Sequence, residues 1–201
     1  MTFSALSYRI FTEATRLYHE TDHVDAPIIN SYAPGTIEND LFLKNWIDTV
    51  QWHLEDIIRQ PDIDPIQALA LKRRIDKSNQ DRTDLVERID SYFFEKFQNA
   101  TPLPDAVINT ESPAWAIDRL SILILKIWHM RAEVERVEAT SEHRQLCNQK
   151  WETLNEQCRD LSSAIDQLLA DIESGRRYMK VYKQMKMYND PSLNPSLYAN
   201  K

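Results

Sequence analysis

The amino-acid sequence predicts an all-α protein: an antiparallel helical bundle of about five main helices with a short basic C-terminal tail. The chain contains only two glycines, and tight hairpin turns depend on glycine. It is rich in residues that favour helices, such as Leu, Ala, Glu, Lys and Arg. Its apolar residues recur at spacings of three and four, which is the period of an amphipathic helix. These observations favour helices throughout.

Length and charge narrow the class of protein. With 201 residues, of which 42% are hydrophobic, the chain is long enough for one domain with a sizeable core. The net charge of -7 argues against a nucleic-acid binder, because phosphate contacts require a basic surface. We therefore expect one all-helical domain over residues 1–201, with an N-terminal helix and loop at 1–35, a bundle core at 36–175 and a basic, tyrosine-rich tail at 176–201.

Three features predict a cytoplasmic protein without a membrane span. The start MTFSALSYRI lacks a basic segment followed by an apolar run, so we expect no signal peptide. The longest apolar run, Ile122 to Leu125, is far too short to cross a bilayer. Cys147 and Cys158 would lie roughly 16 Å apart along one helix, too far for a disulfide, so both are predicted to be reduced core residues.

The first three helices are bounded by recognisable start and stop residues. Thr36 is a candidate N-cap, and Asp64 followed by Pro65 has the pattern of a cap and a first helical residue. Pro61 cannot continue the second helix. We predict helices from about Ser4 to His23, from Thr36 to about Gln60 and from Asp64 to about Gln98, with a loop at 24–35.

The last two helices carry the strongest apolar patterns. Ser112-Pro113 opens the fourth helix after a loop at 99–111. Its stretch from Leu120 to Met130 is apolar on nearly all sides, which predicts the central helix of the bundle. In the fifth helix, apolar spacings of four and three alternate, as in antiparallel bundle packing, and Gly175 sits where a C′ glycine would end the helix. The apolar residues at these spacings are Cys147, Trp151, Leu154, Cys158, Leu161, Ile165, Leu168 and Ile172.

The segment from His19 to His23 reads H-E-x-x-H, a motif in which two histidines one turn apart hold zinc. The helical wheel places His19 and His23 opposite the apolar stripe of the first helix, on a solvated face. A catalytic zinc also needs a third ligand and a dry cavity. The sequence therefore predicts no metal at this motif, and no cofactor is expected.

Carboxylate motifs for other metals are weaker. A ferritin-like site needs Glu-x-x-His on two helices, and only Glu20 to His23 fits. All-α nucleotide pyrophosphohydrolases hold magnesium with paired Glu-x-x-Glu/Asp groups, which Glu87 with Asp90 and Glu135 with Glu138 could imitate, although the pairs are widely separated. There is no Gly-rich phosphate loop and no G-x-S-x-G motif.

Polar residues inside apolar helical stripes are the more informative candidates for a site. An uncompensated buried charge costs several kcal/mol, so Arg82 must be paired or lie at a cavity. A carboxylate such as Asp118 is its candidate permanent partner. The candidates are His53 and Asp56 in the second helix, Asn79 and Arg82 in the third, and Asp118, Lys126 and His129 in the fourth.

Four segments of the chain resemble a bacterial family catalogued as domain of unknown function 4254. They are QWHLEDIIR at 51–59, DKSNQDRTDLVERID at 76–90, DRLSILILKIWHM at 118–130 and KMYNDPSLNP at 186–195. The similarity extends over most of the chain from about Thr36 onward. It implies an all-α fold and a bacterial source, and it implies no established activity, cofactor or catalytic residue.

Two classes of function remain open, and with them whether the protein is an enzyme. In the first, the seven candidate residues line a pocket for a small phosphorylated or carboxylated ligand, since Arg and Lys suit anions. In the alternative, the polar core is an ion-pair network and the protein is a non-catalytic interaction module. It would then bind a protein partner or a second copy through the fifth helix or the tail. The tail carries Arg176, Arg177, Lys180, Lys183 and Lys186 among Tyr178, Tyr182, Met185 and Tyr188.

Overall fold

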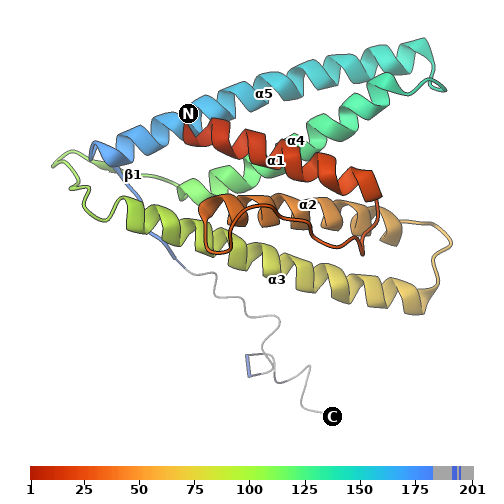
Figure 1. Cartoon of the computed structure of the whole chain (residues 1–201), viewed down its shortest axis with the longest axis horizontal. Helices are drawn as coiled ribbons and strands as arrows, with labels where there is room; N and C mark the ends of the chain where they lie inside the picture. The colour runs from red at the N-terminus through yellow and green to blue at the C-terminus, as the bar shows by residue number, and fades with distance from the viewer. Residues whose placement is uncertain (183–191, 194, 196–201) are drawn as a thin grey trace.

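A computed structural model of the chain describes residues 1–182, 192–193 and 195 (Figure 1). Within these residues there are five helices, which contain 70% of the described residues, and the predicted all-α bundle is confirmed. The elements are α1 (Phe3–Thr21), α2 (Ile37–Ile58), α3 (Pro65–Lys96), β1 (Val107–Ile108), α4 (Pro113–Glu135), α5 (Ser141–Glu173) and β2 (Arg177–Tyr178).

The helices begin where the capping residues predict. Thr36 accepts a hydrogen bond from the Asn39 N–H through its side chain at 3.2 Å, and Asp64 accepts two from the first turn of α3. Pro65 and Pro113 each occupy the first position of a helix, where the missing N–H of proline costs nothing. Local chemistry therefore sets these boundaries.

Helix α4 is the central helix, as predicted. It packs against each of the four other helices, while α2 with α3 and α4 with α5 form neighbouring pairs (Figure 1). The core joins apolar residues from all five helices. They include Ile10, Phe11, Ala14 and Tyr18 of α1, Leu41, Phe42 and Trp46 of α2, Val86, Ile89 and Phe93 of α3, Ile117, Leu120 and Ile124 of α4, and Cys158, Ile165 and Leu169 of α5.

Two short strands join segments far apart in the sequence. Strand β1 pairs in parallel with β2, so that Val107 lies opposite Arg177 and Ile108 opposite Tyr178. The sequence predicted only a loop and a short helical or irregular tail here, because two residues are too few to show an alternating pattern. Arg177 also pairs with Asp171 of α5 at 3.3 Å. The tail residues Lys183, Met185, Lys186 and Tyr188 lie outside the described residues.

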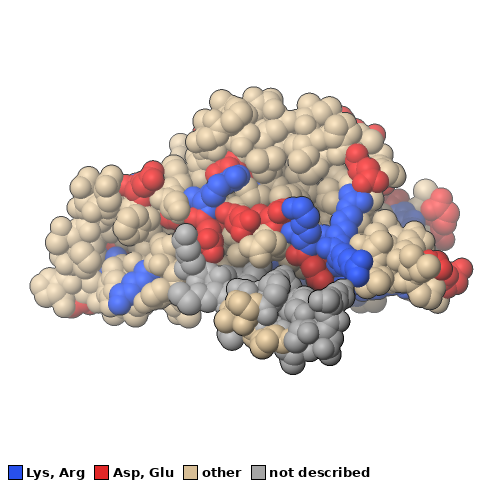
Figure 2. Space-filling view, turned by 90° about the horizontal axis from the view of Figure 1, so that it is seen from below, with Lys and Arg blue, Asp and Glu red and all other residues tan. Residues whose placement is uncertain are grey.

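The surface carries charges of both signs. On the face seen from below in Figure 1, acidic and basic side chains lie beside one another across the middle of the molecule (Figure 2). Both cysteines are free and buried, as predicted. Among the described residues, no helix combines the length and the apolar character that crossing a membrane requires.

Gly175 ends α5 in the left-handed conformation, as the sequence predicts. Its φ is 74°, and a Cβ there would lie 2.3 Å from the carbonyl oxygen of Thr101. The Gly175 carbonyl in turn accepts a hydrogen bond from the Leu103 N–H at 2.9 Å. This close approach holds the α3–α4 connection against the end of α5.

We expect Gly175→Ala to lower the free energy of unfolding by more than the roughly 1–3 kcal/mol typical of backbone strain alone, because the added methyl group also meets Thr101. Gly35→Ala is the matched control, since Gly35 has a φ of 83° but no atom within 4 Å of its Cβ position. Denaturant titration measures both losses. Equal losses would contradict the close approach.

Candidate functional site

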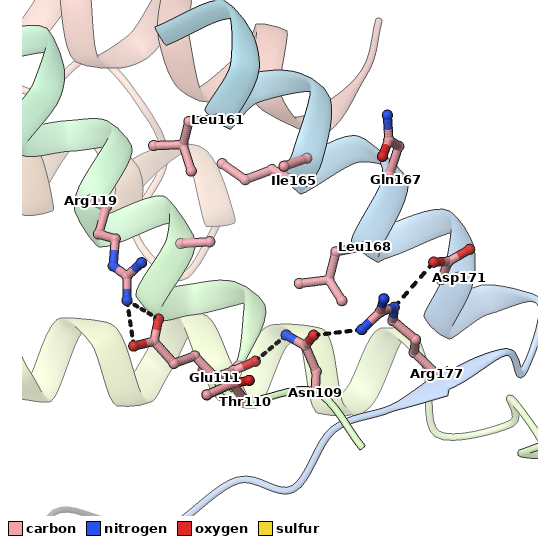
Figure 3. A pocket seen from close by; sticks show the side chains of 13 residues that line it. Asn109, Thr110, Glu111, Arg119, Leu161, Ile165, Gln167, Leu168, Asp171 and Arg177 are labelled. Atoms are coloured by element: carbon pink, nitrogen blue, oxygen red, sulfur yellow. Dashed lines mark hydrogen bonds and ion pairs between the residues drawn. The ribbon is translucent and has the colours of Figure 1, made fainter. Parts of the chain in front are cut away.

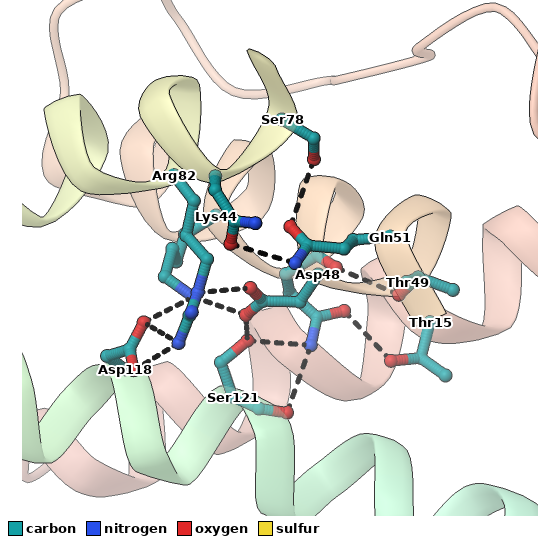
Figure 4. Close-up of polar contacts among 11 residues, drawn as sticks. Thr15, Lys44, Asp48, Thr49, Gln51, Ser78, Arg82, Asp118 and Ser121 are labelled. Atoms are coloured by element: carbon teal, nitrogen blue, oxygen red, sulfur yellow. Dashed lines mark hydrogen bonds and ion pairs between the residues drawn. The ribbon is translucent and has the colours of Figure 1, made fainter. Parts of the chain in front are cut away.

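Four charged side chains meet between α2, α3 and α4 (Figure 4). Lys44 of α2 donates from Nζ to Asp48 Oδ2, and the same nitrogen lies 2.9 Å from Asp118 Oδ1. Arg82 of α3 donates from Nη2 to the two Asp118 oxygens at 2.8 and 2.6 Å. Its Nε lies 3.0 Å from Asp48 Oδ1. Each carboxylate therefore meets both cations.

This four-charge cluster is electrically balanced and largely removed from water. Lys44 is fully buried, the Asp48 and Asp118 side chains are 3% and 6% exposed, and the Arg82 side chain is 24% exposed. Desolvating a charge costs several kcal/mol unless a partner compensates it. Two cations and two carboxylates compensate one another here, so the cluster needs no ligand to be stable.

Neutral polar residues extend the cluster to α1. Ser121 donates to Asp48 Oδ2 at 2.6 Å, and Asn45 donates to Ser121 Oγ at 3.1 Å. Thr15 of α1 then donates to Asn45 Oδ1 at 2.8 Å. The chain of hydrogen bonds thus connects α4, α2 and α1, and buried polar networks of this kind define the packing of a core.

The structure brings some of the predicted site residues on α3 and α4 together and leaves another at the surface. Arg82 pairs with Asp118, the partner named in the structural alternative. Asn79 lies beside them and accepts a hydrogen bond from Gln51 at 2.9 Å. Lys126, expected inside the bundle, is exposed. That expectation was wrong because the neighbouring helices leave this strip of α4 open, where the ammonium stays hydrated.

Lys44 and Asp48 were missed by the sequence analysis. They continue the helical line that starts at Leu41, at spacings of three and four, so the same polar-in-stripe signal that identified Arg82 was present in α2. The apolar face that includes Trp46 was expected to be the only inward face of this helix, so the line through Lys44 and Asp48 was not considered. A helix enclosed by three others has buried residues on more than one face.

Arg82→Met removes one cation and leaves Asp48 and Asp118 buried without full compensation. We expect it to cost about 3–5 kcal/mol of unfolding free energy, measured by denaturant titration. Arg88→Met is the matched control, since Arg88 is 54% exposed and pairs with Asp40 at the surface; its loss should stay below about 1 kcal/mol. A small loss for Arg82→Met, with wild-type stabilisation by phosphate that the variant lacks, would instead favour an anion site.

Three histidines from three different helices form a second cluster. His19 of α1, His53 of α2 and His129 of α4 each place one ring nitrogen within 4.8 Å of those of the other two. The Nε2 atoms of all three are buried and have no hydrogen-bond partner in the described chain. Asp22 Oδ1 lies 3.7 Å from His53 Nε2. The histidine cluster therefore combines buried, unpaired bases with a carboxylate at its edge.

Neighbouring groups fix the orientation of these rings. The Nδ1 of His19 lies 2.7 Å from the Thr15 carbonyl oxygen, and since a carbonyl only accepts, Nδ1 must donate and Nε2 keeps its lone pair. Aromatic rings hold the cluster from the sides. Trp52 stacks on His129 with 4.7 Å between the ring centroids. Tyr18 stacks on His53 with a centroid distance of 5.1 Å, and the ring of Trp128 lies at the same centroid distance from that of His19.

The expectation that His19 faces solvent was wrong. Helix α1 ends at Thr21, with Asp22 in the left-handed region at φ 49°, so His23 lies beyond the helix with a side chain 64% exposed. His19 instead turns toward α2 and α4, whose rings cover it. A helical wheel built from α1 alone identifies only its most apolar face.

Burial disfavours the protonated forms of His53 and His129. Desolvation, together with the neighbouring His19 and His53, lowers the pKa of His129 to about 4. Desolvation also lowers the pKa of His53, opposed by the charges of Asp22 and Asp56. Asp56 is exposed and makes its contribution through space. Imidazoles with such pKa values offer free lone pairs at neutral pH.

The lowered histidine pKa values predict acid sensitivity in the presence of a metal chelator. An unfolded histidine binds its proton below about pH 6.5, whereas folded His129 does so only near pH 4. Between these values the unfolded state binds more protons, so stability must fall as pH falls, by up to about 3 kcal/mol. Denaturant titrations from pH 7 to 4 measure this. His129→Gln should flatten the slope and His23→Gln should leave it; equal slopes in all three proteins would argue against the cluster.

A groove lies between α4, α5 and the residues before α4 (Figure 3). It has a volume of about 520 Å³ and an apolar wall that includes Leu161, Ile165 and Leu168. Its charged groups pair across the rim. Arg119 binds Glu111, and Arg177 binds Asp171 and Asn109. None of the seven predicted site residues lines it.

Comparison with protein-family models matches residues 38–181 to a family described as "Protein of unknown function (DUF4254)". The match covers more than half of the chain, so the chain belongs to this family, as the sequence resemblance indicated. His53 and His129 lie within the matched region, and His19 and Asp22 precede it. Searches of curated proteins and of solved structures gave no match. A bacterial source and a cytoplasmic location stay predictions of the sequence.

Proposed function

We propose that this member of the DUF4254 family is a metal-binding protein, which holds one divalent transition metal on His19, His53 and His129, with Asp22 as a fourth ligand. The observation that carries the proposal is that one ring nitrogen from each of the three histidines converges on one region, and that each ring has a buried Nε2 atom without a hydrogen-bond partner. Unpaired buried polar atoms are uncommon in folded proteins. A metal ion would satisfy all three at once.

The distances between the ligand atoms and the hydrogen bond made by the other nitrogen of His19 support this assignment. Ligands at about 2.0 Å from a tetrahedral zinc lie about 3.3 Å from one another. Asp22 Oδ1 is already 3.7 Å from His53 Nε2, and small ring rotations would bring the other nitrogens inward. The bond from His19 Nδ1 to the Thr15 carbonyl is the type of contact that orients metal-binding histidines.

Charge and ligand type favour Zn²⁺ or a similar ion. Imidazole suits Zn, Cu, Fe and Ni, and a carboxylate is compatible with each. Three neutral histidines leave the charge of a dication to be balanced, and Asp22 and Asp56 are both near enough to act on the pKa of His53 and His129. Because Asp22 is 60% exposed, the fourth position lies at the solvent edge, where water or a substrate oxygen could exchange with it. The centre thus suits Lewis-acid chemistry.

The contacts of Arg82 support the alternative interpretation, in which the polar core is a structural ion-pair network and not a ligand site. Arg82 already has two carboxylate partners, so an anionic ligand would have to displace one of them. The metal proposal replaces the expectation of no cofactor, which rested on a solvent-facing His19. A partner for α5 or the tail stays a prediction.

The histidine centre predicts that purified protein binds Zn²⁺ with a stoichiometry that falls by one equivalent when a ligand is removed. His53→Gln and His129→Gln should each lower the affinity of this site at least about 100-fold, measured by calorimetric titration. Zn²⁺ at 100 times its Kd should raise the unfolding free energy of the wild type by about 2.7 kcal/mol.

His23→Gln is the matched control, because His23 belongs to the same short motif but is exposed. It should bind Zn²⁺ like the wild type. Each variant is first compared with the wild type in EDTA by thermal melting, so that a loss of metal is not mistaken for a loss of fold. Unchanged stoichiometry in both ligand variants would refute the proposal.

A further inference from the structure

We propose that the protein has a second and independent site for a thiophilic divalent cation such as Zn²⁺, formed by Glu133, His143 and Cys147 where α4 meets α5. His143 Nε2 lies 2.9 Å from Glu133 Oε2 and 3.3 Å from Cys147 Sγ. The three ligand atoms share one small space, and they are separate from those of the histidine cluster. This site does not rest on the proposed function.

The geometry is close to that of a bound metal. Around a tetrahedral zinc, a nitrogen lies about 3.4 Å from an oxygen ligand and about 3.6 Å from a sulfur ligand. The separations from His143 Nε2 are 2.9 and 3.3 Å, so the side chains need to part by only a few tenths of an ångström. A water would complete the four ligands, as it does where three protein ligands hold zinc.

The ligands differ in exposure in a way that suits entry from solvent. Cys147 is buried, with 5% of its surface exposed, whereas the Glu133 and His143 side chains at the rim are 39% and 41% exposed. The sulfur would lose its proton to solvent as the metal–sulfur bond forms, because the thiolate is the ligand. Thiolate and imidazole together favour Zn²⁺ over Mg²⁺ or Ca²⁺.

Arg136 is the group that opposes a cation at this site. Its Nη1 lies 3.2 Å from a Glu133 oxygen and its Nη2 3.5 Å from His143 Nε2. Its side chain is 48% exposed, so a metal can displace the guanidinium into water. A metal there would join the last turn of α4 to the first two turns of α5 across residues 136–140.

Co²⁺ provides the test, because a cobalt–thiolate bond gives a near-ultraviolet charge-transfer band that histidine and carboxylate ligands do not produce. We expect this band when Co²⁺ is added to reduced wild-type protein, and its loss on addition of Zn²⁺. Cys147→Ser should abolish the band. Cys158→Ser is the matched control, since Cys158 is the other buried cysteine of α5, and it should retain the band.

Further variants keep the test decisive. His143→Gln changes a rim residue, should fold even if Cys147→Ser does not, and should lower the Co²⁺ affinity at least about 100-fold. Arg136→Gln should raise that affinity. His53→Gln should leave the band unchanged, so failure of the histidine centre and failure of this site are distinguished. Absence of the band in wild type, or its persistence in Cys147→Ser or at full affinity in His143→Gln, would overturn the second site.

Discussion

The arrangement of helices depends on the buried cluster of ion pairs that Lys44 and Arg82 form with Asp48 and Asp118. Each carboxylate is shared by both cations, so every member is needed to compensate the others. Apolar side chains alone tolerate sliding and rotation of one helix on another, whereas charged hydrogen bonds have narrow geometry. The cluster therefore fixes how α2 and α3 lie on the central helix, at the cost of desolvating four charges.

The same constraint reaches the histidine cluster through Thr15. Its hydroxyl donates to Asn45, which belongs to the buried network, and its carbonyl oxygen accepts from His19 Nδ1. His53 and His129 lie on α2 and α4, the helices that the charged cluster holds together. Three ligands on three helices keep their relative positions only if those helices do. The structural network thus positions the candidate metal centre.

Sequence reasoning recovered what local chemistry determines. Pro65 and Pro113 mark helix starts because the fixed φ of proline suits the first helical position, and Gly175 marks a helix end because glycine adopts a positive φ at little cost. The Arg82–Asp118 pair was foreseeable because a charge in an apolar stripe needs a partner. His19 was misplaced because its second buried face exists only once α2 and α4 cover it. The pairing of β1 with β2 likewise depends on tertiary position, since neither strand has a sequence signal of its own.

The charged cluster and the histidine cluster differ in whether their members already have partners. This difference distinguishes a structural role from a ligand-binding role. In the charged cluster, Arg82 Nε makes no hydrogen bond but lies 3.0 Å from Asp48 Oδ1, so every charge faces one of opposite sign and none remains to attract an anion. In the histidine cluster, burial disfavours protonation of His53 and His129, and the three rings that meet there each carry an Nε2 atom without a hydrogen-bond partner. A proton there is disfavoured by desolvation and by the neighbouring rings, whereas a metal ion gains three bonds in exchange for its hydration. The unpaired bases, rather than the buried arginine, mark the position where a ligand improves the folded state.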